Sequence, residues 1–266
     1  MRQGRDRICS KGSHLSRVES GAEFSVAAVL PTLNEARNIS QLLPLVARGL
    51  ASVATEFEVI VVDDGSSDGT AEIARRVAVE RDLPVRVLSR EGVRDLSSAV
   101  VFGASRARAT YVIVMDSDFS HDPSAIPAIL EPLRQGADVS VGSRHVRGGA
   151  ISNWPLRRRL FSRLATLVAR PLCATSDPMS GYFATKRELL LSPALRPRGF
   201  KILLELLGRN PRLVLAEVPI SFRDRAQGES KFGSKQARQF LRQCGSILLW
   251  RLFRSWSRRG SRPDPC

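Results

Sequence analysis

The stretch from Tyr111 to His121, which reads YVIVMDSDFSH, constrains the fold of this 266-residue chain more than any other. Its first five residues are apolar and mostly β-branched, and such a run is typical of a buried strand. Asp116 and Asp118 follow directly, with Ser117 between them. Because ligands of open α/β sheets bind at the carboxyl ends of the strands, we expect both carboxylates at a binding edge.

Two carboxylates one residue apart offer hard oxygen ligands of the kind that Mg²⁺ and Mn²⁺ prefer. Mg²⁺ is often held between one or two carboxylates and the phosphates of a substrate. The alternative is a turn in which one aspartate caps the next helix, and a motif this short, taken alone, favours that turn. The rest of the chain therefore decides between the two interpretations.

Further apolar runs alternate with helical patterns on both sides of this stretch. Strands are predicted at residues 24–30, 58–62, 85–88, 111–115 and 138–141. Helices are predicted to begin near residue 38 and to span 70–81, 96–108 and 123–134. Since such alternation builds right-handed βαβ units, the chain is predicted to be an α/β protein with a mainly parallel, Rossmann-like sheet and flanking helices.

Polar side chains follow three of the predicted strands, and this convergence favours a binding site over three unrelated turns. No GxGxxG follows the first strand and no GxxxxGK[ST] occurs, which disfavours dinucleotide-binding enzymes and P-loop NTPases. Carboxylates at strand ends suit a nucleotide whose phosphates are held through a metal. The polar side chains are Asn34 and Glu35, Asp63 and Asp64, and Asp116 and Asp118.

Composition restricts the partners. A net charge of +15 and a pI near 11.0 attract anions such as nucleic acid, acidic lipid or phosphorylated substrates. The chain carries no recognisable nucleic-acid reader motif and only 6% aromatic residues, so no nucleic-acid partner is expected. Its four cysteines are scattered without CxxC spacing, so no zinc site is indicated.

Seven stretches resemble the glycosyltransferases of family 2 with a GT-A fold, and within them the polyprenyl (dolichyl) phosphate mannose synthases. Together they cover about residues 25 to 235, in the order of the family. The last of them narrows the resemblance to transferases that use prenyl phosphates. They read VLPTLNEARNI, VIVVDDGSSDGT, VIVMDSDFSHDP, VGSRHVRGG, DPMSGYFATKRELL, GFKILLELL and EVPISFRDRAQGESKFG.

The resemblance implies a function for matching positions. The nucleotide pocket would be lined by Pro31, Leu33, Glu35, Val62 and Asp64. The metal and diphosphate would be bound by Asp116 and Asp118, with Ser117 and Ser120 beside them and Ser120 as a further metal contact. Substrate phosphates and sugar would be contacted by Arg144, Arg225 and Lys231, of which the last two are also expected to act in catalysis. The lipid phosphate would be held by Arg158 and Ser162.

The chain departs from the family pattern at several positions. Leu33 stands where an aromatic residue is usual, which weakens the expectation that the base stacks there. Ser120 replaces a frequent Gln and is a weaker candidate for a third metal contact. Asp95 and Leu96 replace part of a common GLG, and His145 replaces a common Tyr.

A prenyl phosphate acceptor is already an anion near neutral pH, so transfer to it requires no strong general base. The three histidines of the chain form no catalytic dyad in the sequence pattern. His121 is interpreted as a hydrogen-bonded loop histidine rather than a metal ligand. Asp177 is the fallback base, and a loop or capping carboxylate before Pro178 is the equal alternative.

Two basic amphipathic segments are predicted helices, at residues 154–172 and 236–256. The first places Leu160, Leu164 and Leu167 on one face, and the second ends in Trp and Arg side chains that suit a membrane interface. The alternative for the first segment is a solvated helix with an ordinary core face, and the equal alternative for the second is a C-terminal helix docked on the domain. Their candidate lipid contacts are Arg157, Arg158, Arg159 and Arg163, and Arg238, Arg242, Arg251 and Arg254.

The predicted organisation is a disordered basic tail at 1–22, a catalytic domain at 23–235 and an amphipathic helix with a basic tail at 236–266. No uncharged apolar run approaches the roughly 20 residues that a membrane span needs. We therefore expect a peripheral protein on the cytoplasmic face of an anionic membrane, and any membrane-protein partner is left open.

The leading interpretation is an inverting transferase that uses Mg²⁺ or Mn²⁺ to move mannose from GDP-mannose to a polyprenyl phosphate. UDP-glucose or another donor is the close alternative, and a nucleic-acid-binding protein or a catalytically inactive sugar-nucleotide-binding module is remote.

Overall fold

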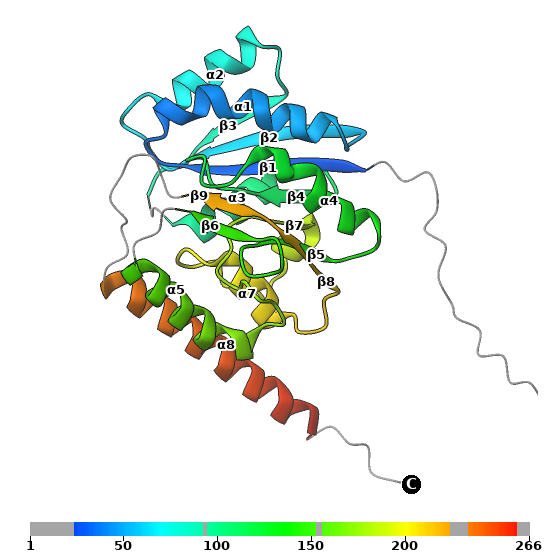
Figure 1. The fold of residues 1–266 in the computed structure, drawn as a ribbon, viewed down its shortest axis with the longest axis vertical. Coiled ribbons are helices and arrows are strands. Elements are labelled where there is room, and N and C mark those ends of the chain that lie inside the picture. The colour runs from blue at the N-terminus through cyan, green and yellow to red at the C-terminus, as the bar shows by residue number, and fades with distance from the viewer. Residues whose placement is uncertain (1–23, 93–94, 153–155, 224–233, 260–266) are drawn as a thin grey trace, which may run out of the picture.

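The computed structural model describes residues 24–92, 95–152, 156–223 and 234–259, and a seven-stranded sheet lies at its centre (Figure 1). The strand order is β3-β2-β1-β4-β7-β5-β8. Every neighbouring pair is parallel except the two that include β7, which runs against both β4 and β5. The strands are β1 (Ser25–Thr32), β2 (Glu56–Asp63), β3 (Val85–Ser89), β4 (Tyr111–Val114), β5 (Val139–Ser143), β7 (Phe183–Lys186) and β8 (Leu215–Pro219).

The five predicted strands are confirmed within a few residues as β1 to β5, and the helices between them are confirmed as well. The structure adds β7, β8 and a small parallel sheet of β6 (Ala150–Ser152) with β9 (Ser221–Arg223). The helices are α1 (Ala36–Ala51), α2 (Thr70–Glu80), α3 (Leu96–Arg106), α4 (Ile126–Arg134), α5 (Leu156–Ala169), α6 (Arg187–Leu190), α7 (Ile202–Arg209) and α8 (Ser234–Arg259), with short 3-10 turns at η1 (Pro123–Ala125) and η2 (Arg170–Leu172).

Alternate residues of the central strands face opposite layers, as the period of two in a strand requires. In β1, Val26 and Leu30 pack in the layer that contains α1 and α4, whereas Val29 packs in the layer that contains α3, α7 and α8. Helix α3 lies very close to the sheet because Gly103 faces it: a Cβ on Gly103 would lie 2.6 Å from Val29 Cγ1. This contact fixes α3 against the strands whose ends form the site.

The C-terminal helix is docked on the domain along its first half. Phe240, Cys244 and Ile247 are buried, and Ile247 fits against Gly208 of α7, where an added Cβ would lie 2.8 Å from Ile247 Cγ2. Arg251 donates to the carbonyl oxygens of Gly208 and Leu172 at 2.8 and 2.6 Å. Arg251, predicted as a lipid contact, therefore binds the protein's own backbone, because the ends of α7 and of η2 leave carbonyls without helical partners.

A buried ion pair lies beneath this docked helix. Glu205 and Arg209, one turn apart on α7, are 2% and 1% exposed and form a hydrogen-bonded pair. Arg209 also donates to Ser246 of α8 at 3.1 Å, and the Glu205 carboxylate accepts from the side chain of Gln243 at 3.3 Å. The pair therefore joins α7 to α8 by polar as well as apolar contacts.

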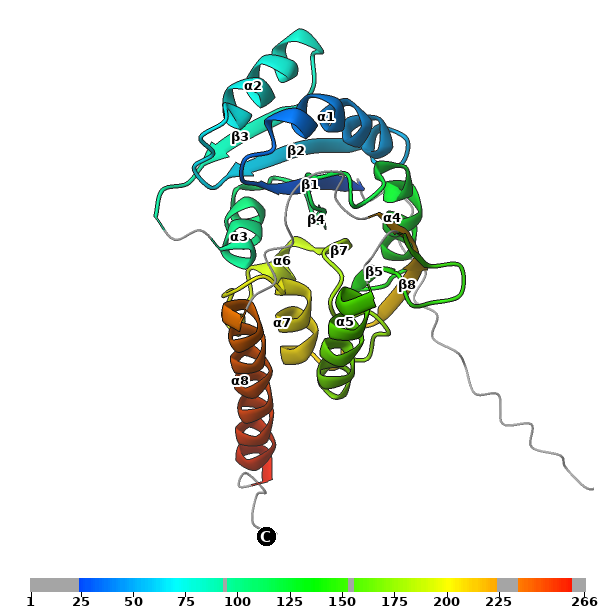
Figure 2. The ribbon, with the colours of Figure 1, turned by 60° about the vertical axis from the view of Figure 1, so that its left-hand side comes forward.

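Helices α5 and α8 extend together from the end of the molecule opposite to α2, with α7 between them in the turned view (Figures 1 and 2). In the described residues, no helix combines the length and the apolar character that crossing a membrane requires. The predicted tail at 1–22 lies outside these residues, and the division of the chain at residues 235/236 stays a prediction.

Candidate active site

The carboxyl ends of β1, β2 and β4 meet at one edge of the sheet, where the sequence predicts the site. Thr32 and Asp63 are register partners at the ends of β1 and β2, and the Asp64 N–H donates to the Thr32 carbonyl at 3.0 Å. Beyond β4, the Ser117 hydroxyl donates to the Pro31 carbonyl at 3.2 Å. The predicted nucleotide and metal segments are therefore neighbours.

The loops after β1 and β2 are held together by short polar contacts. The Asn34 side chain accepts from the Ser67 N–H at 2.9 Å, and the Asn34 N–H donates to the Ser66 hydroxyl at 2.9 Å. Asn34 has a φ of 61°, a conformation that asparagine tolerates better than most residues. Asp68 accepts from the N–H groups of Ala36 and Thr70, at 3.0 and 3.1 Å. Burial alone raises the pKa of Asp68, but a hydrogen bond from the Thr70 hydroxyl, together with those from the two N–H groups, lowers it below its usual value.

Asp64 is bound by a residue that the sequence did not single out. Arg90, just beyond β3, donates from Nε and Nη2 to the two Asp64 carboxylate oxygens at 2.7 and 2.8 Å. The guanidinium also donates to the Ser98 hydroxyl and the Asp95 carbonyl of α3 and its cap. A bidentate pair of this kind is geometrically well defined, so Arg90 sets the position of the Asp64 carboxylate. A nucleotide that reaches Asp64 would meet Arg90 as well.

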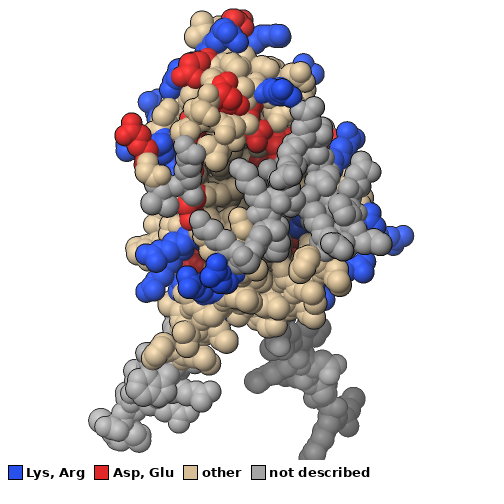
Figure 3. Space-filling model, turned by 90° about the vertical axis from the view of Figure 1, so that its left-hand side faces the viewer, with Lys and Arg blue, Asp and Glu red and all other residues tan. Residues whose placement is uncertain are grey.

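The DSD motif lies immediately after β4, as predicted. The Asp116 side chain is 29% exposed, whereas Asp118 is buried and accepts the Ser120 N–H at 3.0 Å. Figure 3 shows this edge of the sheet face on. Acidic side chains gather around a hollow at its middle, and basic side chains lie below it, toward the end that carries α5 and α8.

His121 holds the backbone of this motif in place. Its Nδ1 accepts the Asp116 N–H at 3.0 Å, and its ring stacks on Tyr182 and meets the edge of Phe222. Burial lowers the pKa of His121, although the carboxylates of Asp116 and Asp118 raise it. A nitrogen that accepts a backbone hydrogen bond cannot ligate a metal at the same time. The predicted hydrogen bond of this loop histidine is present, and it occupies Nδ1.

The residues present fit a divalent cation that a substrate helps to hold. Ser120 Oγ is buried and has no hydrogen-bond partner within the described ranges, which makes it a third oxygen available beside Asp116 and Asp118. Gly181 leaves room beside them, because a Cβ there would lie 3.3 Å from Asp116 Oδ2. No group of three or more His, Cys, Asp or Glu side chains in the described residues could enclose a metal. This donor set matches Mg²⁺ or Mn²⁺ shared with phosphates better than a closed protein cage.

Arg144, just beyond β5, is held by Asp177. The Arg144 Nε and Nη2 donate to the two carboxylate oxygens at 2.7 Å each, and the Arg144 N–H donates to Asp177 Oδ2 at 3.0 Å. Burial raises the pKa of Asp177, but the hydrogen bonds and charge of Arg144 outweigh it and lower the pKa below its ordinary value. A carboxylate held as an anion through both oxygens is a poor proton acceptor, which disfavours Asp177 as a base.

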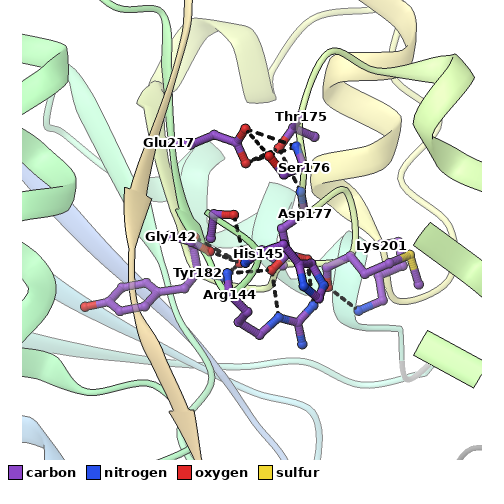
Figure 4. A network of polar contacts seen from close by, with 12 residues as sticks. Gly142, Arg144, His145, Thr175, Ser176, Asp177, Tyr182, Lys201 and Glu217 are labelled. Atoms are coloured by element: carbon purple, nitrogen blue, oxygen red, sulfur yellow. Dashed lines mark hydrogen bonds and ion pairs between the residues drawn. The ribbon is translucent and has the colours of Figure 1, made fainter. Parts of the chain in front are cut away.

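The segment that carries Asp177 is fixed at both ends (Figure 4). Glu217 of β8 accepts hydrogen bonds from the hydroxyls of Thr175 and Ser176, both at 2.8 Å. The Ser180 hydroxyl donates to the Gly142 carbonyl at 2.7 Å, and Lys201 Nζ donates to the carbonyl of Met179 at 2.7 Å. Residues 175–181, the anchoring segment, are therefore tied to β5, β8 and the start of α7.

The remaining predicted site residues lie in the loop after β1, on α5, in the core or outside the described residues. Pro31, Leu33 and Glu35 are half-buried in the loop after β1, and Ser162 is half-buried on α5. Val62 is fully buried among core residues that pack under α3. Arg225 and Lys231 lie outside the described residues, as does the side chain of Arg158. Their predicted roles stay predictions.

Comparison with known proteins identifies relatives by sequence. The family model described as glycosyl transferase family 2 matches residues 27–192. A dolichol-phosphate mannosyltransferase from Pyrococcus furiosus is 37% identical over 231 residues, which are 85% of this chain and 64% of that protein. A dolichol-phosphate mannosyltransferase from Saccharomyces cerevisiae is 37% identical over 239 residues, which are 86% of this chain and 88% of that protein. The chain thus spans less than two thirds of the first relative and most of the second.

Solved structures share the architecture. The glucosyl-3-phosphoglycerate synthase from Mycobacterium tuberculosis, crystallised with Mn²⁺, UDP-glucose and glycerol 3-phosphate, superposes with a TM-score of 0.61. The two sequences are 22% identical, and the match covers 85% of this chain and 79% of the other. At this identity the match shows a common fold.

Proposed function

Because this chain belongs to glycosyltransferase family 2 and has the GT-A fold, we propose that it is an inverting transferase that moves mannose from GDP-mannose to a polyprenyl phosphate. The observation that carries the proposal is the meeting of three polar strand ends, after β1, β2 and β4, of which the last carries Asp116 and Asp118. Two relatives 37% identical to the chain are dolichol-phosphate mannosyltransferases, which supports mannose as the sugar and a prenyl phosphate as the acceptor.

In this proposal Asp116, Asp118 and Ser120 hold the cation, and the loops after β1 and β2 hold the nucleotide. A bound Mg²⁺ or Mn²⁺ would offset the negative charge that the diphosphate leaving group gathers. Arg144 is proposed to meet a substrate phosphate with a positive charge whose orientation the protein sets in advance. Arg225 and Lys231 are proposed to add positive charge that stabilises the diphosphate as its negative charge develops.

The acceptor phosphate attacks the anomeric carbon as an anion, so the protein has to orient it rather than deprotonate it. Two observations agree with this chemistry. His121 uses Nδ1 to accept a backbone hydrogen bond, and Asp177 is neutralised by Arg144. Arg158 and Ser162 on α5 are the proposed holders of the lipid phosphate.

A donor screen tests the proposed function. The purified chain is incubated with geranyl phosphate, Mg²⁺ or Mn²⁺ and one of GDP-mannose, UDP-glucose, UDP-galactose or GDP-glucose, and products are read by mass spectrometry. We expect a mannosyl product of inverted configuration from GDP-mannose. A glucosyl product from UDP-glucose in its place would move the proposal to the alternative donor. Nucleotide-sugar turnover that needs no prenyl phosphate would rule out a prenyl phosphate as the acceptor.

Membrane contact is proposed through the outer faces of α5 and α8. Ten large apolar side chains there are between 46% and 67% exposed, and exposed arginines accompany them. Apolar side chains and polybasic contacts, each worth roughly 1 kcal/mol near anionic lipid, together hold a protein at a surface reversibly. The apolar side chains are Leu160, Phe161, Leu164, Leu167 and Val168, and Leu241, Leu248, Leu249, Leu252 and Phe253; the arginines are Arg159, Arg163, Arg238 and Arg242.

We expect this surface to bind vesicles that contain phosphatidylglycerol and to release them at 1 M salt, where the Debye length falls to about 3 Å. Leu249→Ser with Leu252→Ser should weaken vesicle binding in a flotation assay, because exposed leucines that enter the lipid are lost. The control is Val79→Ser, which removes an 83% exposed apolar side chain from α2 at the far end. Equal binding by both variants would refute the placement of the surface. The cytoplasmic side of the membrane is proposed from the soluble sugar nucleotide that the reaction uses.

A further inference from the structure

The side chains of the Arg144–Asp177 ion pair are held in place more completely than those of an exposed ion pair. Both side chains are buried, with 7% and 0% of their surfaces exposed. Three hydrogen bonds reach the one carboxylate, two from the guanidinium and one from the Arg144 N–H. Side chain and backbone of Arg144 are thus fixed relative to each other, so the guanidinium has one orientation.

A chain of contacts connects this pair to the candidate metal motif. The Arg144 Cζ lies 5.2 Å from the ring centroid of Phe222, and the Phe222 ring meets His121 edge-on at 5.4 Å. His121 in turn holds the Asp116 N–H. Arg144 therefore lies in the same packed unit as the carboxylates, and a shift of its guanidinium changes the surroundings of the reacting groups.

We infer that Asp177 is a positioning residue, which aims the Arg144 guanidinium at the phosphate of the acceptor. The inference rests on the proposed function, because it takes a prenyl phosphate as the anion that Arg144 meets. A planar guanidinium binds phosphate with a directional pair of donors, so its orientation matters more than its charge alone. The anchoring segment 175–181 supplies that orientation, since Glu217 fixes its start and Gly142 its end.

Asp177→Asn, Arg144→Gln and the double variant test the inference. Geranyl phosphate and GDP are titrated separately by calorimetry in each variant, and transfer kinetics are measured with both substrates. Each single substitution should weaken geranyl phosphate binding roughly 10- to 100-fold, because small displacements of a positioned group have large effects. The double variant should bind as the Arg144→Gln variant does, and GDP affinity should stay within about twofold of wild type in all three.

A loss of stability does not distinguish a positioning role of Asp177 from a purely structural one. In both cases the substitution leaves the Arg144 guanidinium buried without its counter-charge. Asp177→Glu keeps the charge and serves as the second variant: it should fold, yet weaken geranyl phosphate binding, because a longer side chain displaces the guanidinium. Asp138→Asn is the control. It alters another carboxylate with a basic partner, Lys186, and a backbone N–H partner, Val214, at the opposite edge of the sheet. It should leave both affinities unchanged.

Two results would overturn the inference while the proposed function stands. One is unchanged geranyl phosphate affinity in Asp177→Asn together with abolished transfer, which would make Asp177 the base. The other is a double variant in which the losses of geranyl phosphate affinity seen in the two single variants multiply. A wild-type chain that neither binds geranyl phosphate nor glycosylates it would reject the proposed function itself, and the inference with it.

Discussion

Asp116→Asn and Asp118→Asn should each lower the turnover of sugar transfer by about 100- to 1,000-fold or more, while the fold is retained. Asparagine has nearly the same shape, and at residue 118 its oxygen can still accept the Ser120 N–H. What each variant loses is the negative charge that holds a divalent cation. Both residues follow the end of β4, outside the apolar interior of the sheet, so the free energy of unfolding should change little.

The measurement is turnover at saturating donor, with Mn²⁺ titrated from micromolar to millimolar concentrations. Asp122→Asn is the matched control. It removes a carboxylate of the same loop that is exposed and caps the turn at Ser124, and it should leave turnover near the wild-type value. Wild-type transfer that continues undiminished in EDTA would remove the cation from the proposed chemistry.

The second large effect concerns stability. Arg209→Met should lower the free energy of unfolding by about 3 to 5 kcal/mol, because it leaves the Glu205 carboxylate buried without its counter-charge. Glu205 keeps other donors, the Arg196 N–H and the Gln243 side chain, but neither neutralises it. The loss should be accompanied by partial release of α8, which Arg209 contacts at Ser246.

Chemical denaturation monitored by fluorescence and by far-UV circular dichroism measures this effect. Arg75→Met is the comparison, since Arg75 and Glu72 form an exposed pair at 3.9 Å, and it should change stability by no more than about 0.5 kcal/mol. Adding Glu205→Leu to Arg209→Met should recover much of the loss, because no buried charge then remains. A loss below about 1 kcal/mol in Arg209→Met would show that water reaches Glu205.

The strands most accessible to prediction are those that are buried on both faces. β1, β2 and β4 are near-continuous apolar runs, so their positions and the polar residues at their ends follow from the sequence. β7 has no comparable run: its four residues, FATK, are small, polar or charged in three positions. Its burial comes from neighbours on both sides in the sheet, which local sequence does not report.

Pairings between distant residues were the part of the site that could not be predicted. Arg90 lies 26 residues from Asp64, and the two meet only because β2 and β3 are adjacent, with Asp63 opposite Ser89. Asp177 was noted as a carboxylate, but its partner 33 residues away depends on the path of the chain between β5 and β7. The order of strands would have pointed to Arg90, since it follows the strand next to the one that ends in Asp63.

The reversed strand β7 has a consequence for how such an enzyme can diversify. Because Phe183 pairs with both Val114 and Val141, β7 enters the sheet at the edge where β4 and β5 leave it. The connection that precedes β7 therefore reaches the same edge as the loops that follow the parallel strands. In the proposed assignment, the loops after β1 and β2 serve the donor and residues 175–181 serve the acceptor side, so two separate stretches of the chain form the two halves of the reaction centre. Under this assignment, substitutions in residues 175–181 would change the acceptor while the donor half is inherited intact.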